Sequence, residues 1–446
     1  MNNNNNNNNP ADQHNPMATF DRLESEVRGY CRSWPTVFRS AHGHTLVADD
    51  GTEYLDFFAG AGALNYGHNH PALIDALKAH LDAQGFVHAL DLATTTKRDF
   101  IERFEDIILK PRGLDYKLQF PGPTGTNAIE AALKLARKVT GRERVVGFTN
   151  GFHGMTLGAL SITGNSGKRH GAGVPLGNAS SMPYANFLDD MDSLQILESM
   201  IAGDSSGFDL PAAVVVETTQ GEGGINPASA TWMRGLDSIC KRNGILLVVD
   251  DIQVGCGRTG TFFSWENMGI DPDIVTLSKS LSGSGLPMAL VLLKPEHDAW
   301  DPGEHNGTFR GNNAAFVTAT AALELFWRDD ALTLEVGRKS ERVMNGLRAL
   351  HEAHEGLFTD VRGSGLICGI ETALPEIAPL ITTGAFERGV MMETAGAEGE
   401  VIKLLPALTV SDAAIDRALE VLAECANDID DQLVAELRAD QAAVAR

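Results

Sequence analysis

Short apolar runs alternate with longer amphipathic stretches through the middle of the chain. Five of these runs have the length of buried strands, at 145–148, 213–216, 245–249, 274–277 and 288–292. The stretches between most of them repeat their apolar residues with the spacing of one helix face. Because strands that alternate with helices are typical of a doubly wound sheet, we predict an α/β fold built on a large, mainly parallel sheet.

The two ends of the chain show a mixed pattern. An amphipathic segment leads into two short strands at 45–48 and 54–58, which Asp50-Gly51, a dipeptide favoured in hairpin turns, would join. Past residue 318, a long helical stretch comes before two further strands. These strands are at 367–370 and 401–404. At the other end of the chain, the apolar positions of the amphipathic segment are Phe20, Leu23, Val27 and Tyr30.

We expect the two ends to combine into a smaller α+β domain that closes over the large one. The predicted parts are a disordered tail or expression remnant at 1–16, an N-terminal segment of the small domain at 17–70, a large sheet domain at 71–325 and the C-terminal part of the small domain at 326–446. The tail contains an asparagine run at 2–9, so Met17 is the expected natural start.

Composition limits the classes of function. The chain has 446 residues, a formal net charge of −23 and five cysteines without a Cys-x-x-Cys pair. The charge disfavours nucleic acid and anionic membranes as partners, and the scattered cysteines argue against a disulfide framework or a zinc site. No apolar run approaches the roughly 20 residues that span a bilayer, and no signal peptide is visible. We therefore predict a cytoplasmic protein with no metal site and no membrane or nucleic-acid partner.

A carboxylate and a lysine follow two of the predicted strands. Asp250 ends the run at 245–249, and Lys279 comes directly after Ser278 at the end of 274–277. If these strands are parallel neighbours, both charges lie at the carboxyl edge of the sheet, where such sheets bind ligands. A deprotonated lysine can form a Schiff base with an aldehyde, and an aspartate can keep a pyridine nitrogen protonated, which is the chemistry of pyridoxal phosphate. A purely structural ion pair is the alternative.

Two further motifs help to distinguish a pyridoxal phosphate site from a structural ion pair. Gly125 and Thr126 open a predicted helix after a strand, so their N–H groups could bind a phosphate, although an ordinary turn and helix cap is the alternative. Phe152, between glycines, could stack on a planar ring, and its alternative role is that of an ordinary buried phenylalanine. His153 is interpreted as a structural histidine, because Lys279 already provides a base.

Together these motifs resemble the class III aminotransferases, fold-type I pyridoxal phosphate enzymes that include ornithine and 4-aminobutyrate aminotransferases. The resemblance covers about residues 20–427. It is carried by Asp-Asp-Ile-Gln-Val-Gly-Cys-Gly-Arg-Thr-Gly at 250–260, Ser-Lys-Ser at 278–280, Glu-Thr-Thr-Gln-Gly-Glu-Gly-Gly at 217–224, Phe-His-Gly at 152–154 and Gly-Thr-Phe-Arg-Gly-Asn at 307–312.

The resemblance implies a role for each matching residue. Lys279 would form the Schiff base with the cofactor, and Asp250 would pair with its ring nitrogen. The other implied contacts are Ile252 beneath the ring, Gln253 at its phenolic oxygen, Phe152 stacked on it, Gly125 and Thr126 at the phosphate, Glu217, and Thr308 from the neighbouring subunit of a homodimer.

Two positions depart from the common family pattern. Asp251 replaces a glutamate, and Lys403 replaces the arginine that usually binds the substrate carboxylate. Lysine lacks the bidentate fork of arginine, so Arg310 is a candidate helper, with an interface salt bridge as its alternative role. By resemblance, Glu222 would gate Lys403 between the two half-reactions.

Four segments resemble most closely the members of this family that form diaminobutyrate in ectoine biosynthesis. The resemblance implies transfer of the amino group of L-glutamate to L-aspartate 4-semialdehyde, and it also suggests activation by K⁺ and assembly beyond a dimer. Alternatives are a class III aminotransferase of siderophore or antibiotic pathways, one acting on ornithine or 4-aminobutyrate, a pyridoxal phosphate-dependent aminomutase, and a catalytically silent binding protein. The four segments are 57–71, 120–127, 250–253 and 304–312.

Overall fold

The apolar runs in the middle of the chain lie side by side in one sheet. The computed structural model describes residues 15–188, 191–429 and 434–437, so the predicted tail at 1–16 falls almost entirely outside the described residues. Within the described ranges all neighbouring strand pairs of this sheet are parallel except those that β12 makes. The predicted large, mainly parallel sheet is therefore confirmed. Its order is β4 (Lys117–Gln119), β12 (Leu290–Leu293), β11 (Ile274–Leu277), β10 (Leu246–Asp250), β7 (Ala213–Val216), β5 (Val145–Phe148) and β6 (Ala179–Met182).

Helices cover both faces of this sheet. Successive residues of a strand point to opposite faces, so each strand contributes side chains to the packing on both sides. Val215 of β7 is buried in an apolar cluster with α6 (Gly125–Thr140), whereas its neighbour Val214 is buried in another with α10 (Ala230–Asn243). A strand buried on both faces is a continuous apolar run, which explains why the sequence located these strands closely. The other helices are α4 (Pro71–Asp82), α5 (Thr95–Phe104), α7 (Leu157–Ser161), α8 (Ser166–His170), α9 (Ser193–Ala202) and α11 (Asn313–Phe326). Short π and 3₁₀ segments are at Glu105–Leu109, Lys110–Arg112, Lys279–Ser282 and Pro295–His297.

Two strands of the large sheet differ most from the prediction, and β10 is shifted by one residue from the predicted 245–249. Strand β6 was not predicted, because its four residues, Ala-Ser-Ser-Met, lie at an edge of the sheet and only Met182 is buried. β12 begins at Leu290 instead of 288, since the carbonyl of Met288 accepts a hydrogen bond from the hydroxyl of Ser278 at 2.7 Å. Both differences come from tertiary pairing that a local apolar pattern does not record.

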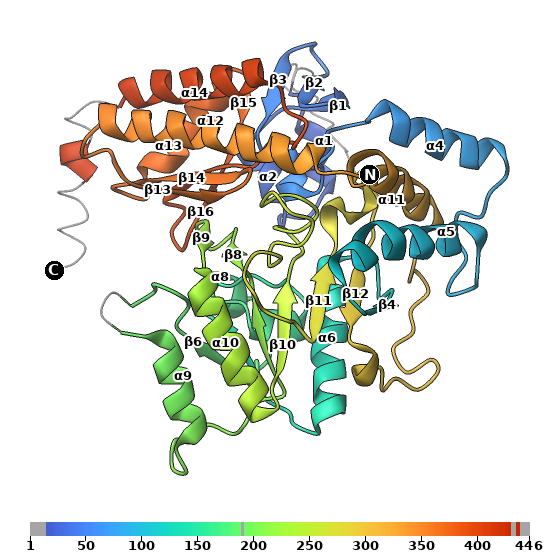
Figure 1. Ribbon diagram of the computed structural model, residues 1–446. Coiled ribbons are helices and arrows are strands. Elements are labelled where there is room, and N and C mark those ends of the chain that lie inside the picture. Colours follow the sequence, from blue (N-terminus) through green and yellow to red (C-terminus); the bar gives the residue numbers. More distant parts are fainter. Residues whose placement is uncertain (1–14, 189–190, 430–433, 438–446) are drawn as a thin grey trace, which may run out of the picture.

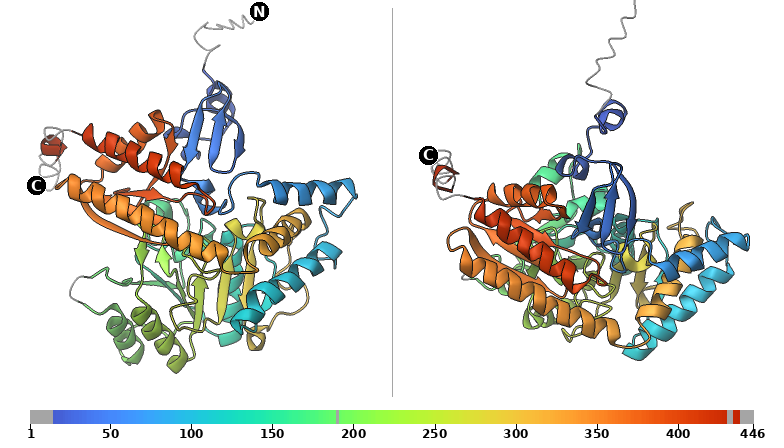
Figure 2. Two further views of the ribbon diagram at one scale, coloured as in Figure 1. Left: turned by 45° about the horizontal axis from the view of Figure 1, so that its top comes forward. Right: turned by 90° about the horizontal axis from the view of Figure 1, so that it is seen from above.

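The N- and C-terminal parts lie together on the side toward which β10 and β11 point (Figures 1 and 2). The predicted hairpin is present, with β2 (Thr45–Ala48) and β3 (Glu53–Asp56) antiparallel around Gly51, whose φ of 94° suits glycine, although β3 ends two residues earlier than the predicted 54–58. Strand β15 (Val390–Met391) pairs with β3, so the C-terminal part completes the N-terminal sheet. This pairing supports the division at 17–70, 71–325 and 326–446, which we keep as a proposal.

Within the described ranges the end regions contain two four-stranded sheets, and residues 219–227 of the middle part add a two-stranded ribbon. The first sheet joins β1 (Phe38–His42), β2 (Thr45–Ala48), β3 (Glu53–Asp56) and β15. The second has the order β13 (Phe358–Ser364), β14 (Ile367–Thr372), β17 (Val401–Leu404) and β16 (Glu393–Ala395), and the ribbon pairs β8 (Thr219–Gln220) with β9 (Asn226–Pro227). The helices are α1 (Ala18–Leu23), α2 (Tyr30–Ser33), α3 (Ala59–Gly62), α12 (Ala331–Ala353), α13 (Ile377–Glu387) and α14 (Asp412–Asn427).

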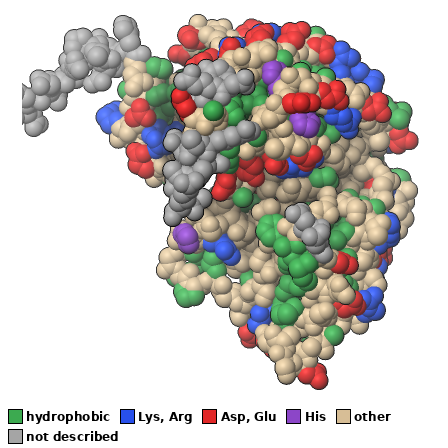
Figure 3. Space-filling model, turned by 90° about the vertical axis from the view of Figure 1, so that its left-hand side faces the viewer, with side chains coloured by type: hydrophobic (Ala, Val, Ile, Leu, Met, Phe, Trp, Pro, Cys, Tyr) green, Lys and Arg blue, Asp and Glu red, His purple; other side chains and the backbone are tan. Residues whose placement is uncertain are grey.

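The amphipathic N-terminal segment does not pack into the core of this chain. Helix α1 contains no buried residue, and Leu23 and Val27 expose 69% and 89% of their surface. Tyr30 packs against Phe58, with ring centroids 4.8 Å apart, but the other apolar side chains of this segment cover no core in the part of the chain that the structure describes. Acidic side chains spread over the upper part of the surface in Figure 3, consistent with the net charge of −23. None of the helices in the described ranges combines the length and hydropathy that a membrane crossing requires.

Candidate active site

The carboxyl edge of the large sheet brings Asp250 and Lys279 to one cavity. Strands β10 and β11 are parallel, with Asp250 opposite Thr276, so Lys279 follows its strand end at the same edge. Both residues line a cavity of about 170 Å³. The cavity is also lined by the other expected cofactor contacts apart from Thr308, namely Gly125, Thr126, Phe152, Glu217, Ile252 and Gln253, together with Glu222.

Asp250 is held by hydrogen bonds and makes no ion pair with Lys279 in the described part of the chain. Its carboxylate lies 2.7 Å from Nδ1 of His153 and accepts hydrogen bonds from the Ile252 N–H at 3.2 Å and the Thr276 hydroxyl at 3.3 Å. Burial lowers the pKa of His153, but the hydrogen bond and charge of Asp250 outweigh it and leave the pKa above its usual value. The structural ion-pair interpretation of Asp250 and Lys279 is therefore wrong.

Lys279 occupies an unusual backbone conformation at the start of a short helical turn. Its φ of 49° lies in the left-handed region, which costs free energy for a residue with a side chain and is found most often at functional sites. Burial, with the nearby charge of Lys403, lowers the pKa of the Lys279 amine, while Glu222 opposes that shift. The amine is therefore more easily neutral than an exposed lysine, as a nucleophile or base requires.

A phosphate cradle lies at the start of α6. Thr124 caps the helix, and its N–H donates to Asn127 Oδ1 at 3.2 Å. A Cβ on Gly125 would lie 3.0 Å from the Ile252 side chain, and one on Gly154 would lie 2.4 Å from Thr126 Oγ1. The glycines therefore keep the cavity open at a helix N-terminus, where an anion is stabilised, so the motif is both a helix cap and a fitting phosphate site.

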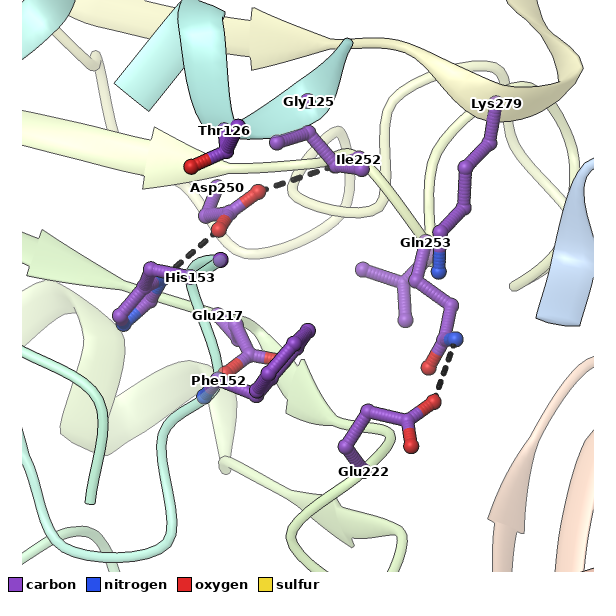
Figure 4. A pocket seen from close by; sticks show the side chains of 12 residues that line it. Gly125, Thr126, Phe152, His153, Glu217, Glu222, Asp250, Ile252, Gln253 and Lys279 are labelled. Carbon is purple, nitrogen blue, oxygen red and sulfur yellow. Dashed lines mark hydrogen bonds and ion pairs between the residues drawn. The ribbon is translucent and has the colours of Figure 1, made fainter. Parts of the chain in front are cut away.

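Phe152 and Ile252 stand on opposite sides of the cavity, with Asp250 toward one end and Lys279 toward the other (Figure 4). The backbone N–H of Phe152 donates to Glu217 Oε1 at 2.9 Å, which fixes the backbone segment that carries the ring. Gln253 Oε1 is buried and has no hydrogen-bond partner within the described ranges. A flat aromatic ring with a polar substituent fits between these walls, so the residues present fit pyridoxal phosphate.

Glu217 and Asp251 are both buried carboxylates, but only Glu217 lines the cavity. Burial raises the pKa of Glu217 to about 7, against the influence of His153. Asp251 instead points to the loop after β10, where it accepts hydrogen bonds from the hydroxyl and the N–H of Ser264. The shorter acid at this position therefore supports a loop and does not contact a substrate in the cavity.

Of the expected substrate contacts, Glu222 lines the cavity and Lys403 lies behind it. The Lys403 amine is fully buried, 2.8 Å from Glu222 and 2.8 Å from Glu393. Sequence patterns did not single out Glu393, and its only signal was a lone acid at the start of a short strand. Gln253 also donates to Glu222, at 2.9 Å.

Arg310 and Thr308 lie outside the cavity of their own chain. Arg310 is 3.8 Å from Asp91, an ion pair within one chain, and lines a separate cavity. The carbonyl of Thr308 faces Nε2 of His88 at 3.0 Å. Within a single chain, Thr308 does not reach the predicted phosphate site, and Arg310 does not reach the cavity in which it was expected to bind a substrate carboxylate.

Comparison with known proteins decides the family. The family model described as aminotransferase class-III matches residues 31–426. This chain is a class III aminotransferase. It is 58% identical to the diaminobutyrate--2-oxoglutarate transaminase of Nocardia farcinica, over 90% of this chain and 92% of the relative, and 53% identical to the protein of that name from Virgibacillus pantothenticus, over 91% and 98%.

Solved structures agree on the fold of this aminotransferase. The ornithine aminotransferase of Toxoplasma gondii ME49 matches with a TM-score of 0.79 and 26% identity, over 92% of this chain and 94% of that one. An S-selective transaminase from Arthrobacter matches with a TM-score of 0.81 and 26% identity, over 92% and 96%. A second structure of the Toxoplasma enzyme is described with partial occupancy of pyridoxal phosphate at its active site. The class III fold accordingly implies this cofactor.

Proposed function

We propose that this chain transfers the amino group of L-glutamate to L-aspartate 4-semialdehyde, which gives 2-oxoglutarate and L-2,4-diaminobutyrate. The observation that carries the proposal is the Lys279 amine toward the opposite end of the cavity from the Asp250 carboxylate, between walls that fit pyridoxal phosphate. The choice of substrates is supported by the relatives at 52–58% identity, which are named for the diaminobutyrate reaction.

Pyridoxal phosphate, when bound, supplies an aldehyde that takes up the amino group and a ring that accepts the electrons of the broken C–H bond. Gly125 and Thr126 would hold its phosphate at the start of α6. The Asp250 carboxylate would keep the proton on the ring nitrogen, and His153 fixes that carboxylate. Lys279 would remove the proton from the substrate carbon that carries the nitrogen and deliver a proton to the former aldehyde carbon of the cofactor, and it would do the reverse in the second half-reaction.

One cavity would serve two substrates in turn. Nitrogen leaves the α carbon of glutamate in the first half-reaction and joins the terminal carbon of the semialdehyde in the second. The α-carboxylate of the semialdehyde then lies farther from the reacting carbon than that of glutamate does. Because the first product leaves before the second substrate binds, ping-pong kinetics are expected.

We propose that the ion pair between Glu222 and Lys403 breaks and forms again between the two half-reactions. Their 2.8 Å ion pair supports the proposal, because it can exchange for a contact with a substrate carboxylate. Glu222→Ala is expected to change the single-turnover rates with glutamate and with the semialdehyde by different factors. Equal factors would contradict the gate.

We propose a homodimer as the minimal active unit. Phe309, next to Thr308, is 65% exposed, and other apolar side chains on the neighbouring segment are exposed as well. A second chain that covers them would bury apolar surface and could receive Thr308 at its own phosphate site. The neighbouring exposed residues are Phe86, Val87, Leu90 and Leu92.

Ectoine biosynthesis is the pathway we propose for this activity, on the basis of the sequence resemblance. Activation by K⁺ and assembly beyond a dimer stay predictions, which activity with and without KCl and the mass in solution would test. The cytoplasm is our proposed location, supported by four cysteines that are buried as free thiols.

A steady-state assay tests the proposed reaction. We expect L-2,4-diaminobutyrate with 2-oxoglutarate to give a higher kcat/KM than ornithine or 4-aminobutyrate, and Lys279→Ala to lower turnover by at least about a thousandfold. A preference for either rival amine would refute the assignment. Rearrangement of the amine without any 2-oxo acid would instead favour an aminomutase.

A further inference from the structure

The cavity wall presents a carboxylate where a cation for substrate carboxylates was expected. Lys403 lies behind the wall, between Glu222 and Glu393, and is fully buried. Of these three residues only Glu222 lines the cavity. A substrate therefore meets Glu222 before it can meet Lys403.

This cluster of Glu222, Glu393 and Lys403 has an excess of negative charge. Two carboxylates face one ammonium group, and Gln253, which also donates to Glu222, is a neutral amide. Glu222 uses Oε1 for both Lys403 and Gln253, whereas its Oε2 makes no hydrogen bond in the part of the chain that the structure describes. A carboxylate oxygen without a donor, on the wall of a cavity, is complementary to an ammonium group.

The charge on Glu222 persists despite its burial. Burial alone would raise the pKa of Glu222, but the charges of Lys403 and Lys279, with the hydrogen bonds from Lys403 and Gln253, hold it well below its usual range. Glu222 is therefore ionised at neutral pH.

We propose that Glu222 binds the α-ammonium group of a diamino acid, and that Glu393 is the specificity-determining residue that leaves Glu222 available by holding Lys403 behind the wall. A diamino acid that reacts at its terminal amine still carries this second ammonium group. The corresponding monoamine has only a methylene group at that position. The inference rests on the proposed function, because it assumes that a terminal amine reacts in this cavity.

Glu393 acts through Lys403 and does not touch the substrate. Burial, with the charge of Glu222, raises the pKa of Glu393, while the charge of Lys403 opposes that shift. When Glu393 is ionised, 2.8 Å from Lys403, the charge of Lys403 is shared between two carboxylates. If Glu393 were neutral, Lys403 would pair with Glu222 alone and cancel the charge that attracts the α-ammonium group. The cluster therefore separates amines that differ only in the α-amino group.

The test compares Glu393→Gln with the wild-type holoenzyme, using L-2,4-diaminobutyrate and 4-aminobutyrate, which lacks the α-amino group. We expect the KM for diaminobutyrate to rise about tenfold or more while the KM for 4-aminobutyrate does not rise. Glu371→Gln is the matched control, because Glu371 lies in the same sheet and pairs with Arg362 away from the active-site cavity. Calorimetric titration of both amines into Lys279→Ala, with and without Glu393→Gln, should show the same selective loss without turnover.

An equal change for both amines in Glu393→Gln would overturn the inference. Glu393→Asp keeps the charge, and we expect it to keep the discrimination; a loss as large as in Glu393→Gln would mean that packing, not charge, is responsible, and would also overturn it. Ornithine and 5-aminovalerate form a second such pair. A preference for ornithine over diaminobutyrate would refute the proposed function, but the inference about Glu222 and Glu393 would still be judged by the ratio within each pair.

Discussion

His153, which is far from Asp250 in the sequence, helps to hold the Asp250 carboxylate in position. His153 makes the shortest of the hydrogen bonds to this carboxylate, at 2.7 Å, compared with 3.2 Å from Ile252 and 3.3 Å from Thr276. The sequence indicated a structural histidine, and the structure adds that it supports the residue expected to bind the ring nitrogen. A fixed, ionised carboxylate is a better partner for a protonated ring nitrogen than one that can rotate.

His153→Phe is expected to weaken pyridoxal phosphate binding about tenfold, because Asp250 loses a charged hydrogen bond while remaining buried. Absorbance titration of the apoenzyme with the cofactor measures the change. His297→Phe is the matched control, since His297 faces Asp273 at 3.0 Å away from the cavity. An equal loss of affinity in both variants would contradict the supporting role of His153.

At the scale of elements, the loop after β10 sets the position of Gln253 and Ile252. Asp251 holds this loop in place by accepting hydrogen bonds from Ser264. Gly255 lies so close that a Cβ there would be 2.6 Å from the Asp251 carbonyl oxygen. The loop therefore depends on one buried carboxylate and one close glycine. Because Asp251 supports this loop and does not line the cavity, the replacement of a glutamate by Asp251 affects the loop and not the contacts with a substrate.

The ionisation of Asp251 should make the stability of the loop depend on pH. Burial raises the pKa of Asp251 to about 7, although hydrogen bonds from Ser264 oppose the shift. Because the unfolded value is about 4, the unfolded chain loses this proton first, and wild-type stability should fall as the pH rises from about 4 to about 7. Asp251→Asn resembles the protonated acid and lacks this loss.

Urea unfolding of both proteins at several pH values within that range measures the effect. The free energy of unfolding of the wild type, relative to Asp251→Asn, is expected to fall by up to a few kcal/mol between the acid and the neutral end. Asp298→Asn, at an exposed carboxylate that pairs with Lys117, controls for a change in surface charge. A difference that stays constant with pH would show that Asp251 is ionised throughout.

At the scale of the whole molecule, the described part of one chain leaves apolar surface exposed and one expected site residue outside the cavity. Thr308 lies outside its own cavity, and apolar side chains of the N-terminal segment and of residues 86–92 are exposed. A second copy that supplies Thr308 would explain both observations. The predicted unit is then a dimer in which each site uses two chains.

Mixed dimers test this arrangement. Thr308→Ala and Lys279→Ala should each be strongly impaired as homodimers, whereas unfolding and refolding an equal mixture should restore activity. If Thr308 acts across the interface, one site of a mixed dimer carries both substitutions and the other carries neither. Activity in the mixture that equals the average of the two parents would contradict a contribution in trans.

The large sheet and the chemistry at its edge could be predicted from the order of residues along the chain. Strands β7, β10 and β11 are buried throughout and mostly apolar because both their faces are covered, so local composition marks them. Parallel strand ends share one edge, and therefore Asp250 and Lys279 could be brought together from spacing alone. The glycines near Thr126 and the aromatic Phe152 added a phosphate site and a ring wall at the same edge.

How these residues are supported, and which charged side chain lines the cavity, depend on contacts between distant parts of the folded chain. His153 reaches Asp250 across 97 positions, and Lys403 reaches Glu222 across 181. Glu393, although near Lys403 in sequence, contacts it because β16 and β17 are antiparallel and place the two residues opposite each other. Such contacts depend on the pairing of strands and the packing of layers, which local patterns of apolar and polar residues do not encode.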